Sequence, residues 1–250
     1  MKARSLILVG IFSFVGFVIA SAPVATLWPR IASMQPALNL AGLSGSVFAG
    51  SASAVSVNGR TVARPLHWVF SPLALLAARL GFHVSGGVDG LSFDGKVART
   101  IGGDIAISAM HGDGALKDLM TMVGSAFLPI DGDVALSIDS LRLVDRFPKQ
   151  LAADLQVSKL RWTLTREPQL LGDFQVSVTT EADVIVARVV PTAGPLDVDG
   201  EIRVMADRHY EVDLKVKAKP GAAPAIQKLV RTLGQADTEG YFRIKTRAQL

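Results

Sequence analysis

The sequence has 250 residues, no cysteine and a formal net charge of +4, and only 19% of its residues are charged. The lack of cysteine excludes disulfides, thiolate metal sites and cysteine nucleophiles. A positive charge this weak also argues against a dedicated nucleic-acid binder, whose basic residues would be dense and clustered. The mean hydropathy of +0.36 is high, so part of the apolar content should face something other than water.

The N-terminus predicts a membrane anchor. Lys2 and Arg4 precede an uncharged run from Leu6 to Ala25, and about 20 apolar residues are enough for a helix to cross the bilayer. Positive charge before such a run places the N-terminus in the cytoplasm. We therefore expect a cytoplasmic stub and single-pass anchor over residues 1–28, a linker over 29–38 and a periplasmic β-rich domain over 39–250.

A cleaved signal peptide is the alternative reading of the same segment. Ala20-Ser21-Ala22 has the small residues of a cleavage site, although Pro23 fits poorly directly after a cleaved bond. Both readings place the rest of the chain outside the cytoplasm.

The chain beyond the anchor alternates between apolar and polar residues, which is the pattern of half-buried β-strands. The first such stretch, Leu40 to Gly50, is rich in Gly and Ser, which permit close approach of neighbouring strands. Asn58-Gly59 is a strong hairpin-turn signal. Asp-Gly pairs at residues 89, 94, 131 and 199 are read as further turns. The pattern predicts a mainly β fold built on a large, curled antiparallel sheet.

Three segments instead have the spacing of short helices. Residues 71–82 begin with Ser71-Pro72 and are apolar nearly all round, which predicts burial on more than one side. Residues 113–124 place Leu116, Leu119, Met120 and Val123 on one face. Residues 221–234 do the same with Ile226, Leu229, Val230 and Leu233. The last two segments should lie on the sheet with their basic residues outward.

No motif of catalysis or cofactor binding is present in the sequence. The four histidines are scattered without metal-ligand spacing, and neither a nucleophile elbow nor a phosphate-binding loop occurs. We expect no enzymatic activity, cofactor, metal site or small-molecule substrate, and no nucleic-acid partner.

The last strands carry an unusual charge pattern. In two predicted strands near the C-terminus, basic residues alternate with apolar or small ones, so each basic set should lie on one face of its strand. These cations are Lys215, Lys217, Lys219, Arg243, Lys245 and Arg247. They form either a solvated sheet face or a contact patch for an acidic partner surface or anionic lipid headgroups.

The order of motifs resembles the type II secretion system protein N family. The N-terminal part of the likeness is "LSGSVFAG" over residues 43–50, Asn58-Gly59, and then Trp68 and Pro72. The C-terminal part runs from residue 209 to the end and includes an amphipathic helix. The residues that match its final turn are Leu233, Gly234, Asp237, Gly240 and Tyr241. Glu239 departs from the family, in which an arginine is commoner in this turn.

The resemblance implies a non-enzymatic inner-membrane component of the type II secretion machinery, which exports folded periplasmic proteins across the outer membrane. Its partners would be other type II secretion system proteins and the inner-membrane bilayer. A lipid-handling protein, which would shield acyl chains in an apolar groove of its β-sheet, is the alternative from another class.

Overall fold

The computed structural model describes residues 23–34, 36–88, 90–122, 129–144, 147–164, 167–207 and 209–249. The chain divides after Asp89 into two compact units, which we call unit 1 (residues 1–89) and unit 2 (residues 90–250). Both units consist mainly of antiparallel strands, which confirms the predicted β class.

The described part of unit 1 contains one α-helix, two small groups of antiparallel strands and a short 3₁₀ helix. Helix α2 (Val24–Met34) covers the end of the expected anchor and part of the expected linker. Strands β1 (Leu38–Ala41), β4 (Ala54–Val57) and β5 (Arg60–Ala63) form a three-stranded sheet. The remaining strands lie in the order β2 (Ser44–Gly45), β3 (Ala49–Ala52), β6 (Leu66–Ser71) and β7 (Arg79–Val88). The stretch from Leu40 to Gly50 therefore divides among three strands rather than forming one.

Two features of unit 1 follow directly from its sequence. Asn58 and Gly59 have φ angles of 52° and 78°, so the predicted hairpin turn between β4 and β5 is confirmed. The indole N–H of Trp68 donates a hydrogen bond to the carbonyl oxygen of Val47 at 3.1 Å. A Cβ atom on Gly50 would lie 2.6 Å from the Trp68 ring, so only glycine fits beneath the indole.

The helix expected over residues 71–82 differs from its prediction. Pro72–Ala77 form a 3₁₀ helix, η1, and none of its residues is buried. Leu73 is 75% exposed and Leu76 is 87% exposed. The all-round apolar composition thus does not place this helix in the core of unit 1, and the prediction of burial is wrong.

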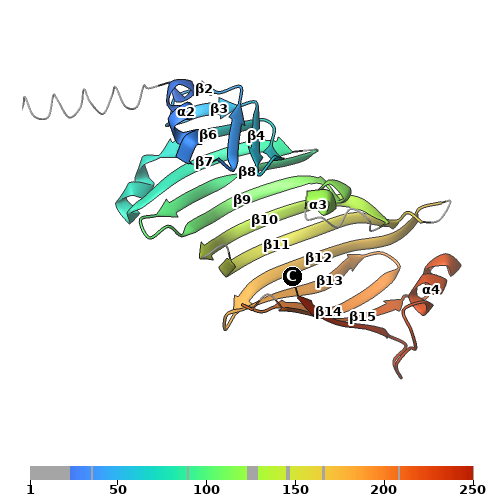
Figure 1. Cartoon of the computed structure of the whole chain (residues 1–250). Coiled ribbons are helices and arrows are strands. Elements are labelled where there is room, and N and C mark those ends of the chain that lie inside the picture. Colours follow the sequence, from blue (N-terminus) through green and yellow to red (C-terminus); the bar gives the residue numbers. More distant parts are fainter. Residues whose placement is uncertain are drawn as a thin grey trace, which may run out of the picture. The chain divides into compact units, whose positions relative to one another are not determined.

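Unit 2 is built around long strands that follow one another in chain order. Its first elements are β8 (Leu91–Thr100), β9 (Ile105–Ala115), α3 (Leu116–Met122), β10 (Ile130–Val144), β11 (Phe147–Trp162) and β12 (Gln169–Glu181). Its last are β13 (Val184–Ala193), β14 (Leu196–Val204), β15 (His209–Ala218), α4 (Pro224–Arg231) and β16 (Phe242–Gln249). Each strand from β8 to β16 pairs antiparallel with the next (Figure 1).

The sheet of unit 2 is open, which corrects the expectation of a curled sheet. A sheet closes on itself only when its outermost strands share hydrogen bonds. Within the described part of the chain, β16 pairs with no strand other than β15. The strand β16 is therefore a free edge.

Helices α3 and α4 cover part of the apolar face of this sheet. Leu116 of α3 packs with Val134 and Val157 in one buried cluster. Ile226 and Val230 of α4 pack in another cluster with Leu196, Val198 and Val216 from the neighbouring strands. Both amphipathic predictions are confirmed for these residues. Leu233 follows the end of α4 and is 40% exposed, so its predicted place on the packed face is wrong. Val123 lies outside the described residues. The helices follow β9 and β15, and these strands run in the same direction, so both helices stand at the same end of the strands.

Most of the Asp-Gly pairs do not form the turns that we expected. The pairs that begin at Asp94, Asp131 and Asp199 lie inside β8, β10 and β14. Gly200 has a φ of +143°, and a Cβ atom there would lie 2.2 Å from the carbonyl oxygen of Asp213. Glycine at this position allows close approach of two strand backbones, which a turn-based reading of the sequence misses.

The predicted anchor lies almost entirely outside the described residues. Its apolar run begins at Leu6, whereas the described chain begins at residue 23. In the part that is described, no helix has the length and apolar character needed to cross a membrane.

Candidate partner-contact surface

The six cations predicted as a contact patch lie in or directly after the last two strands of unit 2. In the β15–β16 pair, Lys215 is opposite Arg243 and Asp213 is opposite Lys245. Opposite residues of a strand pair share a face, and side chains alternate between faces along each strand. Five of the cations therefore lie on one side of the sheet: Lys215, Lys217, Arg243, Lys245 and Arg247. Lys219 directly follows the end of β15.

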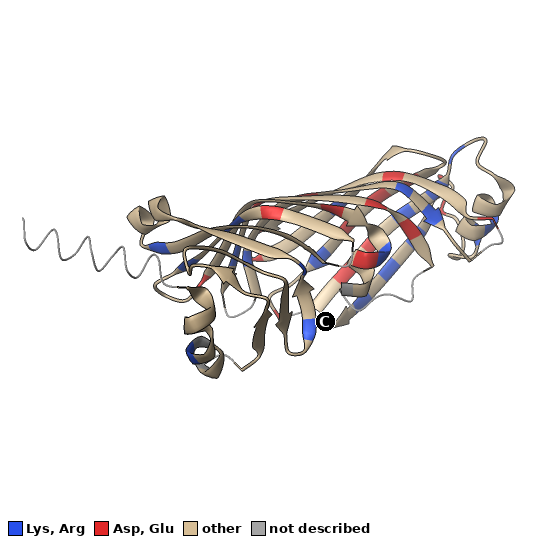
Figure 2. Ribbon diagram, turned by 90° about the horizontal axis from the view of Figure 1, so that it is seen from above, with Lys and Arg blue, Asp and Glu red and all other residues tan. Residues whose placement is uncertain are grey.

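Strand β14 adds carboxylates to this side of the sheet. Asp197 is opposite Lys217, Asp199 is opposite Lys215 and Glu201 is opposite Asp213. We call the resulting surface the charged face. It comprises Asp197, Asp199, Glu201, Arg203, Glu211, Asp213, Lys215, Lys217, Arg243, Lys245 and Arg247. Acidic and basic positions are interleaved across neighbouring strands of unit 2 (Figure 2).

Cross-strand ion pairs order the charged face. Arg243 donates two hydrogen bonds to Asp213, from Nε to Oδ1 at 2.7 Å and from Nη2 to Oδ2 at 2.5 Å. The hydrogen bond from Arg243 holds the pKa of Asp213 below its ordinary value, with smaller contributions from the charges of Arg243, Lys245 and Lys215. Such a bidentate pair fixes the orientation of both side chains.

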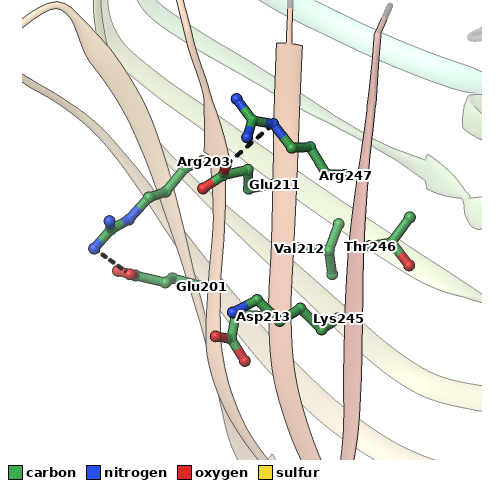
Figure 3. A pocket seen from close by; sticks show the side chains of 8 residues that line it. All are labelled: Glu201, Arg203, Glu211, Val212, Asp213, Lys245, Thr246 and Arg247. Atoms are coloured by element: carbon green, nitrogen blue, oxygen red, sulfur yellow. Dashed lines mark ion pairs between the residues drawn. The ribbon is translucent and has the colours of Figure 1, made fainter.

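The charged face contains a shallow cavity of about 560 Å³. Three carboxylates and three basic side chains line it, together with Val212 and Thr246 (Figure 3). Within it, Arg247 Nε lies 3.3 Å from Glu211 Oε1, and Arg203 forms an ion pair with Glu201. Because acidic and basic side chains line this cavity in equal numbers, it is not selective for anions.

A second cavity, of about 310 Å³, has a different character. Lys217, Lys219 and Arg231 contribute its charges, and no Asp or Glu lines it; Val230 and Phe242 contribute apolar surface. Lys217 donates to the Glu239 carbonyl oxygen at 2.6 Å. Neither Lys219 nor Arg231 makes a side-chain ion pair within the part of the chain that the structure describes. This cavity therefore favours a negatively charged group.

Metal and acid–base chemistry receive no support from the side-chain arrangement. Across the described ranges, no group of His, Asp and Glu side chains is placed to hold a metal ion. Asp213 is the carboxylate of the charged face whose pKa is lowered, and it is paired with Arg243 and partly exposed. Its lowered pKa is that of a carboxylate in a structural ion pair rather than of a buried catalytic acid.

Comparison with known families identifies the chain. A family model described as type II secretion system (T2SS), protein N, matches residues 36–245. The chain belongs to the T2SS protein N family. No curated protein and no solved structure gave a significant match.

The C-terminal motif that resembles the T2SS protein N family forms a tightly bonded turn before β16. Asp237 Oδ1 accepts hydrogen bonds from the backbone N–H groups of Glu239 at 3.0 Å and Tyr241 at 2.8 Å. The bond from Tyr241 is the main reason that the pKa of Asp237 is lowered. Gly240 has a φ of +82°, which favours glycine. Asp237 and Gly240 thus have a structural role in this family member.

Tyr241 ties this turn to the charged face. Its hydroxyl group donates to Asp197 Oδ2 at 2.7 Å, and this bond raises the pKa of Tyr241. The ammonium group of Lys217 lies 5.1 Å from the centre of the Tyr241 ring, a distance compatible with a cation–π contact. The turn therefore holds the ammonium group of Lys217 beside the Glu239 carbonyl oxygen and the Tyr241 ring.

Sequence reasoning missed the carboxylates of β14 and the contribution of Arg231. The signal for the carboxylates was present, since "LDVDGEIRV" over residues 196–204 alternates as regularly as the basic strands. What it lacked was the register that places Asp199 opposite Lys215. Arg231 lies on α4, outside the strands, and only the packing of that helix brings it to Lys219.

Proposed function

We propose that this T2SS protein N family member is a non-enzymatic component of the type II secretion machinery. In this proposal the N-terminal segment anchors the chain in the inner membrane. Units 1 and 2 lie in the periplasm and assist the export of folded proteins across the outer membrane. The family match over residues 36–245 is the observation that carries the proposal.

The charged face supplies the contact surface in this proposal. Its ion pairs are solvent-exposed, with 55% of the Arg243 side chain and 36% of the Asp213 side chain accessible. Exposed pairs contribute little to folding stability, so eleven charged positions on three strands are not explained by stability alone. Charges of this kind select partners and speed association.

Loss of the gene tests the proposed role. In a strain that lacks it, a type II substrate should accumulate in the periplasm, and its extracellular fraction should recover when the full chain is supplied from a plasmid. Unchanged secretion in the deletion strain, with the secretin still required, would contradict the proposal.

Membrane topology is a separate part of the proposal. An alkaline phosphatase fused after Leu250 should be active, and the full chain should sediment with the inner membrane and retain its N-terminus. An inactive fusion would contradict the periplasmic placement. N-terminal sequencing that begins at Pro23 would instead contradict the anchor alone.

A lipid-handling role is a second candidate, favoured by one cavity in unit 2. This cavity has a volume of about 320 Å³ and is lined only by apolar side chains, including Leu116, Val157, Phe174 and Leu196. Its volume is at the low end of the range for ligand sites in proteins. The cavity lies on the apolar face of the sheet, opposite the charged face.

Native mass spectrometry distinguishes the two candidates. A phospholipid bound at one copy per chain after gentle detergent extraction, and lost in a Val157→Trp variant that fills the cavity, would favour lipid handling. Lipid-free protein that still restores secretion would favour the role in protein contacts.

A further inference from the structure

The strand β16 (Phe242–Gln249) presents an unpaired edge. It follows the order β14, β15, β16, and within the described chain only β15 pairs with it. At the start of the strand, Phe242 forms an isolated bridge with Ala236. From Arg243 to Gln249, the backbone N–H and C=O groups that point away from β15 have no strand partner among the described residues. A free edge of this kind can accept an added strand.

All charged side chains of β16 are basic. Arg243, Lys245 and Arg247 occupy alternate positions on the charged face, and β16 contains no acidic residue. We call these three residues the basic stripe. The carboxylates that balance it, Asp213 and Glu211, come from β15. The outer side of the stripe receives no carboxylate from the described residues.

Each of three rows across the charged face ends in a cation on β16. The row Arg203, Glu211, Arg247 alternates in sign. The other two rows each contain one pair of like charges: Asp199, Lys215, Arg243 and Glu201, Asp213, Lys245. Opposite charges in directly opposed positions stabilise a strand pair, and like charges destabilise it. A strand added beyond β16 would therefore need acidic residues at alternate positions.

The apolar face of β16 determines which residues an added strand would need between its acidic positions. Phe242 and Ile244 alternate with the stripe and pack against the apolar cluster under α4. Apolar residues on an added strand would extend this cluster. The complementary segment thus alternates between acidic and apolar residues.

A second copy of this chain does not meet that requirement. Antiparallel pairing of two β16 strands that aligned their apolar faces would also place the two basic stripes opposite each other. Basic residues on an edge strand are a known device against such self-pairing. The same stripe that repels another copy attracts an acidic strand.

We propose that β16 binds an extended acidic segment of another protein by adding it as a strand to the sheet of unit 2. The proposal rests on the function proposed above and makes the basic stripe the docking edge of the charged face. Backbone hydrogen bonds supply affinity, and the stripe supplies selectivity for an acidic partner.

The test uses the full-length protein in detergent and a labelled Glu-Val-Glu-Val-Glu-Val-Glu peptide as the probe. A peptide with proline in place of the central valine keeps every charge but loses a backbone donor. Binding is measured by fluorescence anisotropy at low and high salt. Hydrogen exchange by mass spectrometry locates the protected amides.

We expect the alternating peptide to bind, to slow exchange in residues 242–249, and to weaken as salt rises. The proline peptide should not protect β16. Lys245→Glu together with Arg247→Glu should weaken binding about tenfold, because two attractive cross-strand pairs become repulsive. The control Lys149→Glu, an exposed residue of β11 outside the charged face, should change affinity by less than about twofold.

Three results would overturn the proposal. The first is absence of peptide binding. The second is equal binding of the proline peptide without protection of β16, which would indicate charge attraction alone. The third is binding only to vesicles of phosphatidylcholine and phosphatidylglycerol, which would assign the stripe to the membrane.

Secretion assays separate this proposal from the wider function. If gene deletion leaves secretion unchanged, the proposed function fails. If deletion blocks secretion and the Lys245→Glu/Arg247→Glu variant restores it fully, only strand addition at β16 fails.

Discussion

At the scale of one residue, Asp213 should contribute a small stabilisation of unit 2 that depends on pH. Its pKa is lowered chiefly by the hydrogen bond from Arg243, so the charged form is favoured in the folded state. The stabilisation is present above the ordinary aspartate pKa of about 3.9. It is lost as the pH falls through the lowered pKa of the folded protein.

Asp213→Asn should therefore reduce the loss of melting temperature between pH 5 and pH 3, roughly the window set by aspartate titration. Asp183→Asn is the matched control, because Asp183 is an exposed turn residue without an ion pair in the described chain. Equal acid sensitivity of wild type and Asp213→Asn would show that the Arg243–Asp213 pair does not form.

Gly50 gives a second prediction for a single residue. Its missing side chain makes room for the Trp68 ring and for the Ser44 carbonyl oxygen, each of which would lie 2.6 Å from a Cβ atom at this position. Gly50→Ala should destabilise unit 1 by about 1–3 kcal/mol, the usual cost of overpacking. Trp68 fluorescence during denaturation, in a Trp28→Phe/Trp162→Phe background, measures this loss. The control is Gly102→Ala, because a Cβ atom at Gly102 would meet nothing closer than 3.8 Å. This variant should not change stability. Equal denaturation midpoints for the two variants would contradict the proposed packing of Gly50 beneath Trp68.

At the scale of elements, η1 is the clearest difference between sequence and structure. Leu76 is 87% exposed, so Leu76→Asp should change the melting temperature by no more than about 2 °C. Val55→Asp, at a position 6% exposed in β4, should destabilise unit 1 by several kcal/mol because it buries a carboxylate without a partner. A loss for Leu76→Asp as large as that for Val55→Asp would show that η1 is buried.

The elements show what could be predicted and why. Period-two alternation located most strands, and the spacing of Leu116 and Ile226 located the packed faces of α3 and α4. The turn signals failed at Asp94, Asp131 and Asp199, because glycine serves both turns and close strand approach. The apolar composition of η1 failed because composition does not specify a packing partner.

The candidate surface was predictable only in part. Alternation alone placed Lys215 and Lys217 on one face of their strand. The carboxylates that oppose them, such as Asp199, depend on strand register, and register depends on bulges and on packing between distant segments. Family resemblance in the C-terminal motif was visible in the sequence, but the hydrogen bonds of Asp237 that explain it required the structure.

At the scale of the whole molecule, the proposed function depends on one surface of unit 2. The T2SS protein N match covers both units, whereas the charged face and the free edge of β16 belong to unit 2. The central claim is that this surface mediates the contacts that secretion needs.

The most direct test measures the extracellular fraction of a type II substrate in a deletion strain. The test variant reverses four charges with Lys215→Glu, Lys217→Glu, Arg243→Glu and Lys245→Glu, and circular dichroism checks that it folds. The control reverses four exposed charges elsewhere, with Arg60→Glu, Arg79→Glu, Lys117→Glu and Lys149→Glu. We predict that the control restores secretion and the folded test variant does not. Full secretion with the folded test variant would contradict the claim.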